Sequence, residues 1–382
     1  MKVLLHHHAG VFRDAEGSMH LPAFLGKWVD CMAEHVAQIG LLLPQTTEKQ
    51  AHQDHVLTPR SNLHLHALPT GGRRWDFFQR RRRIAQICRE VSGDYDLLLV
   101  RGITPRQWTV WQNCRTVRKA FLLVGSLREN RPPFGWQPDV FFTWLMLRIR
   151  KMEFGKICRQ PGALLLANSP HLVTELRVGQ GAEPFFASTN TIAGAQIPPF
   201  QFREIHSPVR LLFTGRVVRD KGVEDLLHAL ALLPETYTLR IVGGVAPKYQ
   251  AYLNDMASGL GIGKQVEWAG FIPFGETLLA EYGRADVYVL PSWHEGFPHS
   301  LWEAAAMSTP VLTTPVGGIP GLVDESMVTF VRPRDPADLA RGIENVVKDQ
   351  TERHKKAAKL HAHSYHYHLE NGVKRLLELM TA

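Results

Sequence analysis

The stretch ADVYVLPSWHEGFPHSLWEAAAM, residues 285–307, joins three local patterns in one short segment. Residues 285–292 form an apolar run that predicts a buried strand. Residues 293–298 contain Gly-Phe-Pro, which no regular element favours, and residues 299–307 fit a helix. Ligands bind at the carboxyl ends of strands in open parallel sheets. This strand–loop–helix unit therefore predicts an α/β fold and also the place of its binding site.

The helix after the loop predicts an anion-binding position. Its first-turn N–H groups have no intrahelical partner, and the helix dipole places partial positive charge there. The candidate ligand-binding residues of this turn are Gly296, Phe297, Pro298, His299, Ser300 and Leu301.

Two glutamates flank the predicted anion position. Glu295 precedes the turn, and Glu303 lies inside the helix, about 6 Å along its axis from His299. A carboxylate accepts two hydrogen bonds at once and therefore suits two neighbouring hydroxyls. Hydroxyls on both sides of a diphosphate describe a nucleotide sugar, with the ribose at Glu303 and the transferred sugar at Glu295. The plain alternative is a pair of solvated surface glutamates.

The segment TGRVVRDKG, residues 214–222, adds the positive charge that a diphosphate needs. It follows an apolar run and precedes a helical pattern, so it also lies at the carboxyl end of a strand. Arg216 offers a planar fork and Lys221 a mobile point charge. Together they are predicted to stabilise a departing nucleoside diphosphate without a metal or cofactor. The alternative is that they are helix-start charges on a solvated face.

Apolar runs and helical patterns alternate along both halves of the chain, which predicts parallel sheets with right-handed crossovers. A length of 382 residues suits two domains. The predicted organisation is an N-terminal domain at 1–180, a linker at 181–208, a C-terminal domain at 209–363 and a final helix at 364–382.

Composition bounds the environment of the protein. The sequence contains no run of about 18 apolar residues, so no membrane-spanning helix is predicted. The first residues lack the long apolar region of a signal peptide, and the three histidines 6–8 fit a loop at a strand end. The four cysteines show no CxxC spacing, which favours reduced thiols in a cytosol.

Charge is unevenly divided between the halves. Residues 1–170 hold 24 lysines and arginines against 13 acidic residues, a net charge of +11, whereas residues 171–382 hold 20 against 23, a net charge of −3. The segment Arg73–Arg83, RRWDFFQRRRR, mixes cations with aromatic side chains and predicts binding to an anionic membrane surface. The alternative is an ordinary amphipathic helix packed on the sheet. No nucleic-acid module accompanies the charge, so nucleic acid is not an expected partner.

The second half resembles the donor domain of family 4 retaining glycosyltransferases. The pieces that carry the resemblance are FTGRVVRDKG, VEWAGFIP and ADVYVLPSWHEGFPHSLWEAAAMSTPVLTTPVGG, in this order, within about residues 209–325. The resemblance implies the GT-B fold, in which two Rossmann-like parallel-sheet domains face each other across a cleft. It also implies metal-independent sugar transfer with retention, and a C-terminal helix that crosses back to the first domain.

The resemblance also implies roles for single residues. Glu295 matches the glutamate that contacts the donor sugar, and Glu303 the one that binds ribose. Arg216 and Lys221 match the diphosphate-binding pair. The implied donor-binding backbone includes Gly215, Gly270 and Ile272, of which Gly270–Ile272 brackets the base.

The first half departs from the family pattern. The nearest match to the usual Gly-Gly loop is Gly17 alone, and Gly125-Ser126 stands where many members have a histidine or aspartate. In the second half, Gly321 replaces a frequent glutamate. The candidates for the missing reaction-centre residue are Arg101, Ser126, Arg128 and Glu129.

Two weaker motifs have structural interpretations. The sequence DYD, Asp94–Asp96, fits a metal-binding pattern, but it precedes a strand and is predicted to lie at the amino end of the sheet. The glycine-rich GLGIG, residues 259–263, follows a helix and is predicted to end it rather than to hold phosphate.

These patterns predict a cytoplasmic, peripherally membrane-associated enzyme. It is expected to move a hexose-type unit from a UDP-sugar or GDP-sugar to a glycan or lipid-linked glycan. Two alternatives stay open, namely a non-catalytic nucleotide-sugar-binding subunit and a GT-B epimerase.

Overall fold

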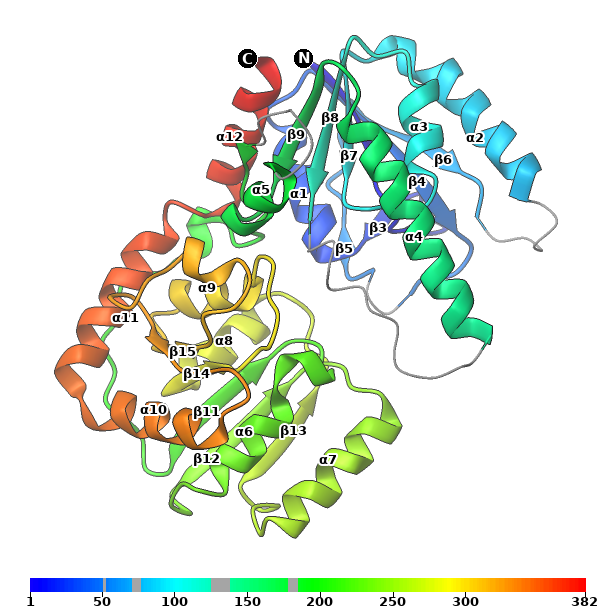
Figure 1. Cartoon of the computed structure of the whole chain (residues 1–382). Coiled ribbons are helices and arrows are strands. Elements are labelled where there is room, and N and C mark those ends of the chain that lie inside the picture. Colours follow the sequence, from blue (N-terminus) through cyan, green and yellow to red (C-terminus); the bar gives the residue numbers. More distant parts are fainter. Residues whose placement is uncertain (51–52, 71–76, 125–137, 178–184) are drawn as a thin grey trace. The chain divides into compact units, whose positions relative to one another are not determined.

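The computed structural model describes the chain in two compact units. The first unit is Met1–Thr191 together with Leu369–Ala382, and the second is Ile192–His368 (Figure 1). The division falls inside the segment 181–208 that the sequence predicts as a linker. The residues described are 1–50, 53–70, 77–124, 138–177 and 185–382.

The first unit is built on a largely parallel sheet. Its described strands follow the order β10-β9-β8-β7-β1-β4-β2-β3-β5, and β6 pairs with β4. The bounds are β1 (Lys2–His6), β2 (Val11–Arg13), β3 (Met19–Leu21), β4 (Gln38–Thr46), β5 (His55–Val56), β6 (Leu63–Leu68), β7 (Leu97–Arg101), β8 (Arg118–Leu123), β9 (Ala163–Ala167) and β10 (Phe185–Phe186).

Helices cover both faces of this sheet, and the apolar strand residues explain why. Leu5 and Leu99 pack into one core cluster, whereas their neighbours Leu4 and Leu98 pack into another. Strands that are buried on both faces read as continuous apolar runs, as the sequence does here. The helices are α1 (Ala23–Ala33), α2 (Phe77–Val91), α3 (Gln107–Asn113), α4 (Pro138–Cys158), α5 (Pro170–Arg177) and α12 (Leu369–Thr381), with a 3₁₀ turn at Ser92–Asp94.

The final helix α12 belongs to the first unit although it follows the second in sequence. Leu369, Val373, Leu376 and Met380 are spaced at three and four residues, and all four are buried in the core that contains Leu5. Arg118 of β8 donates a hydrogen bond to the carbonyl of Thr381 at 2.8 Å. The chain therefore begins and ends in the same unit.

The second unit has a wholly parallel sheet with the order β13-β12-β11-β14-β15-β16. The strand bounds are β11 (Val209–Thr214), β12 (Tyr237–Val242), β13 (Val266–Gly270), β14 (Val287–Leu290), β15 (Val311–Thr313) and β16 (Thr329–Phe330). The helices are α6 (Val223–Leu230), α7 (Pro247–Gly259), α8 (Glu276–Arg284), α9 (His299–Ala306), α10 (Pro336–Lys348) and α11 (Gln350–Ser364), with 3₁₀ turns at Gly194–Gln196, Arg219–Lys221 and Ile319–Gly321.

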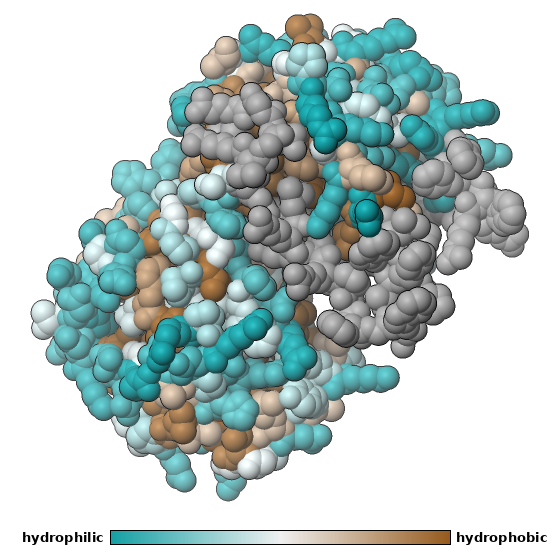
Figure 2. Space-filling view, viewed as in Figure 1, coloured by the Kyte–Doolittle hydropathy of each residue, from teal (hydrophilic) through white to brown (hydrophobic). Residues whose placement is uncertain are grey.

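The two faces of this sheet carry different helices. Leu211 and Phe213 of β11 share a core with the buried face of α6, whereas Thr214 hydrogen-bonds Tyr282 of α8. Helix α6 packs against α7 and α10, and α9 packs against α8 and α11 (Figure 1). Hydrophilic residues cover most of the face drawn in Figure 2, as expected when the apolar residues fill the cores.

The predicted class, two α/β domains with parallel sheets, is confirmed. The apolar runs of the prediction correspond to β1, β7, β8 and β9 in the first unit and to β11–β15 in the second. The prediction missed β2–β6, β10 and β16, most of which are short or carry polar residues; β10 lies in the segment predicted as linker.

Candidate functional site

The carboxyl edge of the second sheet is a ledge of closely packed backbone. Gly215, Gly243 and Gly270 follow or end the neighbouring strands β11, β12 and β13. The N–H of Gly215 donates to the carbonyl of Val242 at 2.9 Å, and that of Gly243 to the carbonyl of Gly270 at 2.8 Å. A Cβ on Gly243 would lie 1.8 Å from the Gly215 oxygen. Only glycine fits at position 243. Because glycine has no side chain, the ledge stays open to a ligand.

Next to this ledge, Lys221 and Glu295 form an ion pair. The Nζ atom of Lys221 lies 2.5 Å from Oε1 of Glu295, and the hydroxyl of Ser292 donates to the same oxygen at 2.6 Å. Glu295 is only 6% exposed and Lys221 is 22% exposed. The structure thus brings together two residues 74 positions apart that the sequence predicts to share a site.

Close backbone contacts hold the two loops of this pair in place. The N–H of Trp293 donates to the carbonyl of Asp220 at 2.8 Å. Gly222 has a φ of +69°, and a Cβ there would lie 2.1 Å from the Pro291 oxygen. The N–H of Gly318 donates to the carbonyl of Glu295 at 2.9 Å. The loops after β11 and β15 therefore contact the loop after β14 from two sides and fix the backbone around Glu295.

Arg216 follows β11 in the same loop as Lys221 but does not join the ion pair. No hydrogen bond or ion pair connects Arg216 with Lys221 or Glu295, all three of which the structure describes. Arg216 is exposed and lines a cavity of about 710 Å³ at this edge, together with Arg219, Tyr249 and Tyr252. No described residue pairs with its guanidinium, which is therefore available to a ligand that reaches the ledge.

Glu303 is held from inside the unit. It lies on α9 and is 7% exposed, and the hydroxyl of Tyr282 donates to its Oε2 at 2.5 Å. The Tyr282 oxygen also lies 2.5 Å from the hydroxyl of Thr214. Burial and the nearby Glu303 carboxylate raise the pKa of Tyr282, so its hydroxyl stays a donor. No sequence pattern indicates Tyr282, because it lies on α8 and reaches Glu303 only through the packing of α8 against α9.

The loop before α9 begins this helix without a side-chain cap. Pro298 is the N-cap residue, and no side-chain hydrogen bond satisfies the first turn there. Phe297 is buried and its ring centroid lies 5.4 Å from that of His299. Gly296 stands between Glu295 and this aromatic pair. Leu301 is fully buried, and Ser300 hydrogen-bonds the buried Tyr288.

The remaining predicted positions are spread over both units. Gly270 has a φ of +70°, Phe271 is 56% exposed and Ile272 is half-buried beside it. Gly17 lies in the first unit, in the turn between β2 and β3, where its N–H donates to the Asp14 carbonyl at 3.1 Å. Gly321 ends a 3₁₀ turn after β15. The candidates Ser126, Arg128 and Glu129, and residues 73–76 of the basic segment, lie outside the described residues.

Both structural interpretations of the weaker motifs are confirmed. The carboxylate of Asp96 accepts a hydrogen bond from the Lys2 N–H at 2.7 Å, at the amino ends of β1 and β7. Gly259 is the last residue of α7, and Gly261 follows with a φ of +75°.

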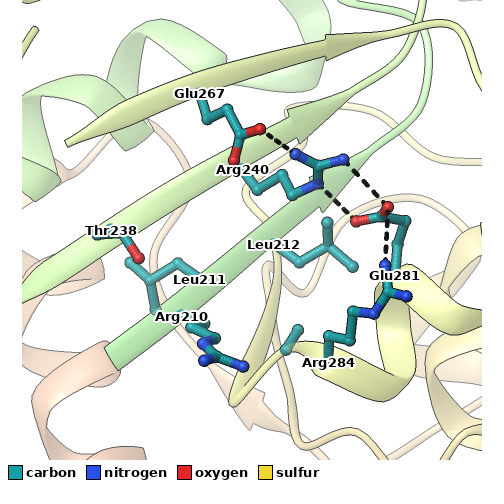
Figure 3. Close-up of a pocket in the computed structure, with 9 residues that line it drawn as sticks. Arg210, Leu211, Leu212, Thr238, Arg240, Glu267, Glu281 and Arg284 are labelled. Atoms are coloured by element: carbon teal, nitrogen blue, oxygen red, sulfur yellow. Dashed lines mark hydrogen bonds and ion pairs between the residues drawn. The ribbon is translucent and has the colours of Figure 1, made fainter. Parts of the chain in front are cut away.

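A second cavity, of about 350 Å³, lies toward the amino ends of β11–β13 (Figure 3). Four of its charged groups pair with one another. Arg240 pairs with Glu281 through two hydrogen bonds of 2.6 and 3.1 Å and also contacts Glu267. Arg284 approaches Glu281 at 3.8 Å. These pairs tie β12, β13 and α8 together, and we assign them a structural role.

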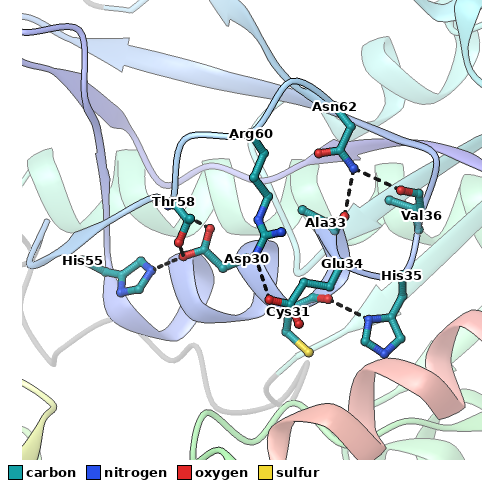
Figure 4. Close-up of polar contacts among 10 residues, drawn as sticks. All are labelled: Asp30, Cys31, Ala33, Glu34, His35, Val36, His55, Thr58, Arg60 and Asn62. Atoms are coloured by element: carbon teal, nitrogen blue, oxygen red, sulfur yellow. Dashed lines mark hydrogen bonds and ion pairs between the residues drawn. The ribbon is translucent and has the colours of Figure 1, made fainter.

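Two acidic residues at the end of α1, Asp30 and the C-cap Glu34, also make structural contacts (Figure 4). Asp30 accepts hydrogen bonds from His55 at 2.8 Å and from the Thr58 N–H at 3.0 Å, and Glu34 pairs with Arg60 at 2.7 Å. Across the described ranges, no three His, Cys, Asp or Glu side chains gather as metal ligands would. None of the helices within those ranges is both long and apolar enough to cross a membrane.

The buried His6 predicts acid sensitivity of the first unit. Its Nδ1 donates to the Leu42 carbonyl at 2.8 Å, so its Nε2 accepts from Thr104 at 3.0 Å. Burial lowers the pKa of His6 from 6.5 to about 4. Between pH 6.5 and about 4, His6 therefore binds a proton in the unfolded chain but not in the folded chain. The stability contributed by neutral His6 is full above pH 6.5 and is lost as pH falls toward 4, by roughly 3 kcal/mol.

Hydrogen exchange of the β1 amides at neutral pH and at about pH 4.5 measures this loss in the first unit alone. The variant His6→Gln should be less stable at neutral pH but should lose less on acidification. Equal losses in both proteins would contradict the assignment to His6.

Three comparisons place this geometry among known proteins. Residues 199–364 match the family model described as glycosyl transferases group 1. An uncharacterized glycosyltransferase of Methanocaldococcus jannaschii is 34% identical over 140 residues, which is 36% of this chain and 36% of the relative. The glycogen synthase of Mycobacterium tuberculosis is 33% identical over 189 residues, which is 48% of this chain and 45% of the relative. The chain spans less than half the length of these two relatives.

Solved structures match over nearly the whole chain. Sucrose-phosphate synthase from Thermosynechococcus elongatus gives a TM-score of 0.73 at 18% identity, with 99% of this chain and 98% of that chain covered. WaaG, a glycosyltransferase of lipopolysaccharide biosynthesis, gives 0.69 at 14% identity, with 100% of both chains covered. Anabaena HepE in complex with UDP and glucose gives 0.71 at 18% identity, with 100% and 99% covered. At these identities the likeness shows the fold alone, and that fold is the predicted GT-B fold.

Proposed function

Residues 199–364 form a domain of the glycosyl transferases group 1 family, and from this premise we propose that the protein is a retaining glycosyltransferase. It moves a sugar from a nucleoside diphosphate sugar to the hydroxyl of a glycan or lipid-linked acceptor. The observation that carries the proposal is the partly buried Lys221–Glu295 ion pair at the carboxyl edge of the second sheet. Parallel α/β sheets bind ligands at this edge.

The strand order supports a donor laid along that edge. From β13 through β12 and β11 to β14, the loops present Gly270–Ile272, the glycine ledge, Arg216 with Lys221, and then Glu295. The base, the diphosphate and the sugar of a nucleotide sugar are linked in the same order as these loops. Glu303 lies on the α8–α9 side of the sheet, where Tyr282 donates to its Oε2, and we assign the ribose hydroxyls to this glutamate.

The proposed chemistry needs charge and position from this chain. The bond between the anomeric carbon and the terminal phosphate oxygen breaks, and the acceptor oxygen bonds to the same face of that carbon. The acceptor proton passes to the leaving phosphate. Lys221 and Arg216 offset the negative charge that grows on this phosphate. Glu295, oriented by Lys221 and Ser292, accepts hydrogen bonds from the hydroxyls of the sugar.

Thermal denaturation in the presence of a panel of UDP-sugars and GDP-sugars tests the donor. A ligand at a hundred times its dissociation constant stabilises the folded state by about 2.7 kcal/mol. No stabilisation by any of these compounds would contradict the proposal. Binding without transfer or hydrolysis would favour a binding subunit instead, and recovery of an isomerised donor would favour an epimerase.

Removal of metal ions is expected to leave the turnover rate unchanged. The reason is that Lys221 and Arg216 supply the cationic charge that a divalent ion would otherwise provide. The measurement compares turnover before and after treatment with EDTA. Loss of turnover that Mg²⁺ or Mn²⁺ restores would contradict metal independence.

We further propose that the protein acts in the cytoplasm, bound peripherally to an anionic membrane surface. The support is the basic first half and the exposed row Arg81–Arg83 on α2. Each basic residue near such a surface contributes about 1 kcal/mol, so replacing both Arg81 and Arg82 by glutamine should weaken vesicle binding roughly thirtyfold.

Co-sedimentation with vesicles that contain phosphatidylserine measures this effect. The matched control replaces Arg284 and Arg341, two exposed arginines of the second unit. Equal binding of both variants would contradict a surface formed by α2.

A further inference from the structure

Trp293, two residues before Glu295, joins the two loops that carry the Lys221–Glu295 ion pair. Its backbone N–H donates to the carbonyl of Asp220 at 2.8 Å. Its indole Nε1–H donates to the carboxylate of Asp225 at 2.7 Å. Asp220 directly precedes Lys221, and Asp225 follows it in the first turn of α6. The two N–H groups of one tryptophan therefore hold the Lys221 segment on both sides.

A cation covers the ring of the same tryptophan. The guanidinium carbon of Arg334 lies 4.4 Å from the centroid of the Trp293 ring, a distance at which the positive charge is attracted to the aromatic face. Arg334 belongs to the loop between β16 and α10. Trp293, in the loop after β14, thus contacts the loops that follow two other strands of this sheet, β11 and β16.

The backbone of Arg334 is held in an unfavourable conformation. Its φ is +61°, in the left-handed region that a residue with a Cβ rarely adopts. The turn is fixed from α10, because the N–H of Arg332 donates to Asp338 at 2.8 Å and the Arg332 side chain pairs with Asp335 at 2.9 Å. Asp335 is the N-cap residue of α10. Strain of this kind persists where the surroundings impose it, often at functional sites, and here it places a guanidinium on Trp293.

The connection from Trp293 to the ion pair is short. Ser292 precedes Trp293 in the chain, and its hydroxyl donates to Oε1 of Glu295 at 2.6 Å, the same oxygen that Lys221 contacts. Thr314 of the loop after β15 donates to the Ser292 carbonyl at 2.5 Å. A shift of Trp293 would therefore displace both side chains that donate to this carboxylate oxygen.

We propose that Trp293 is a positioning residue for sugar transfer, and that Asp225 and Arg334 lock its indole in place. Trp293 acts through the Lys221–Glu295 pair, whose position relative to the departing diphosphate and the sugar sets the rate. A misplacement of about 1 Å can slow a reaction roughly a hundredfold. The effect on rate rests on the proposed transferase function, whereas the effect on the ion pair does not.

Five variants of the full chain isolate these contacts. Trp293→Phe keeps the backbone N–H and an aromatic ring but loses the indole N–H. Asp225→Leu removes the acceptor at similar size, whereas Asp225→Asn keeps an acceptor oxygen. Arg334→Gly removes the cation and also the strain of the positive φ. Trp268→Phe is the matched control, because Trp268 is a partly buried tryptophan of β13 in the same unit.

Steady-state kinetics give the first readout. Trp293→Phe, Asp225→Leu and Arg334→Gly should lower kcat roughly tenfold or more, with the KM of the donor changed less than about threefold. Asp225→Asn and Trp268→Phe should retain most of the turnover. The double variant of Trp293→Phe and Asp225→Leu should be no slower than either single variant, because both remove the same hydrogen bond.

Arg334→Gly separates positioning from a purely structural role, because it should slow transfer without lowering the unfolding temperature. If Trp293→Phe does not fold, the two variants of Asp225 decide. Full kcat in folded Trp293→Phe or Asp225→Leu, or an equal loss in Trp268→Phe, would overturn the proposal.

The second readout needs no turnover. The coupling between Lys221→Met and Glu295→Gln, measured by urea unfolding of the single and double variants, reports on the ion pair itself. This coupling should fall by roughly half or more in the Trp293→Phe background and stay unchanged in the Trp268→Phe background. If the wild-type chain transfers no sugar, the proposed function fails, and the coupling still tests the positioning of the pair. A coupling that Trp293→Phe leaves unchanged would overturn the proposal.

Discussion

Replacing Lys221 by methionine is expected to slow sugar transfer by roughly 10²–10³-fold. The ammonium lies 2.5 Å from Glu295, so its loss removes a cation from the leaving diphosphate and the orienting partner of the glutamate. Glu295 is 6% exposed and would keep Ser292 as a donor but lose its counter-charge. We therefore also expect a loss of stability of about 1–3 kcal/mol. Steady-state kinetics and urea unfolding measure the two effects.

The partner substitution separates the two effects. Glu295→Gln removes the acidic charge but keeps a group that hydrogen-bonds Ser292. Combined with Lys221→Met, it should restore most of the stability, because no buried charge is left alone, and it should leave transfer as slow as in Lys221→Met. A folded Lys221→Met protein with full turnover would show that the pair is structural only.

Substituting Gly243 by alanine is expected to destabilise the second unit by roughly 3 kcal/mol. The new Cβ would lie 1.8 Å from the Gly215 oxygen, and φ at this position is +151°. The strand ends that form the ledge would have to separate. Urea unfolding measures the change.

The adjacent Gly244 offers a matched control. A Cβ on Gly244 would meet nothing within 4 Å, and its backbone needs no positive φ. Gly244→Ala should therefore change stability by less than about 1 kcal/mol. Equal stability of the two variants would contradict the close packing of the ledge.

The strands that could be predicted are those whose own sequence is apolar along nearly its whole length. Strands such as β11, with VRLLFT, and β14, with VYVL, are apolar along nearly their whole length, because helices cover both faces. β6 was missed because its sequence, LHLHAL, alternates leucine with histidine. Its place next to β4 depends on the parallel pairing of Leu63–Leu68 with residues 39–44, a contact between strands that are not adjacent in the sequence pattern.

The candidate site divides in the same way. Lys221 and Glu295 could be predicted to meet, because both follow strands and strand ends share one edge of a parallel sheet. The donor of Glu303, Tyr282, could not, because it lies on a helix and reaches the carboxylate only after α8 and α9 pack. The same holds for the burial of Arg101, which is 1% exposed and contacts the Phe24 carbonyl and the Trp28 ring only after α1 packs on the sheet.

A crystal structure of the protein with a bound UDP-sugar or GDP-sugar tests the central claim most directly. The account predicts the diphosphate within hydrogen-bonding distance of Lys221 and Arg216, and the sugar hydroxyls on Glu295. A nucleotide sugar bound elsewhere, such as in the cavity around Arg240, or an empty carboxyl edge in crystals soaked with a compound that binds in solution, would contradict it.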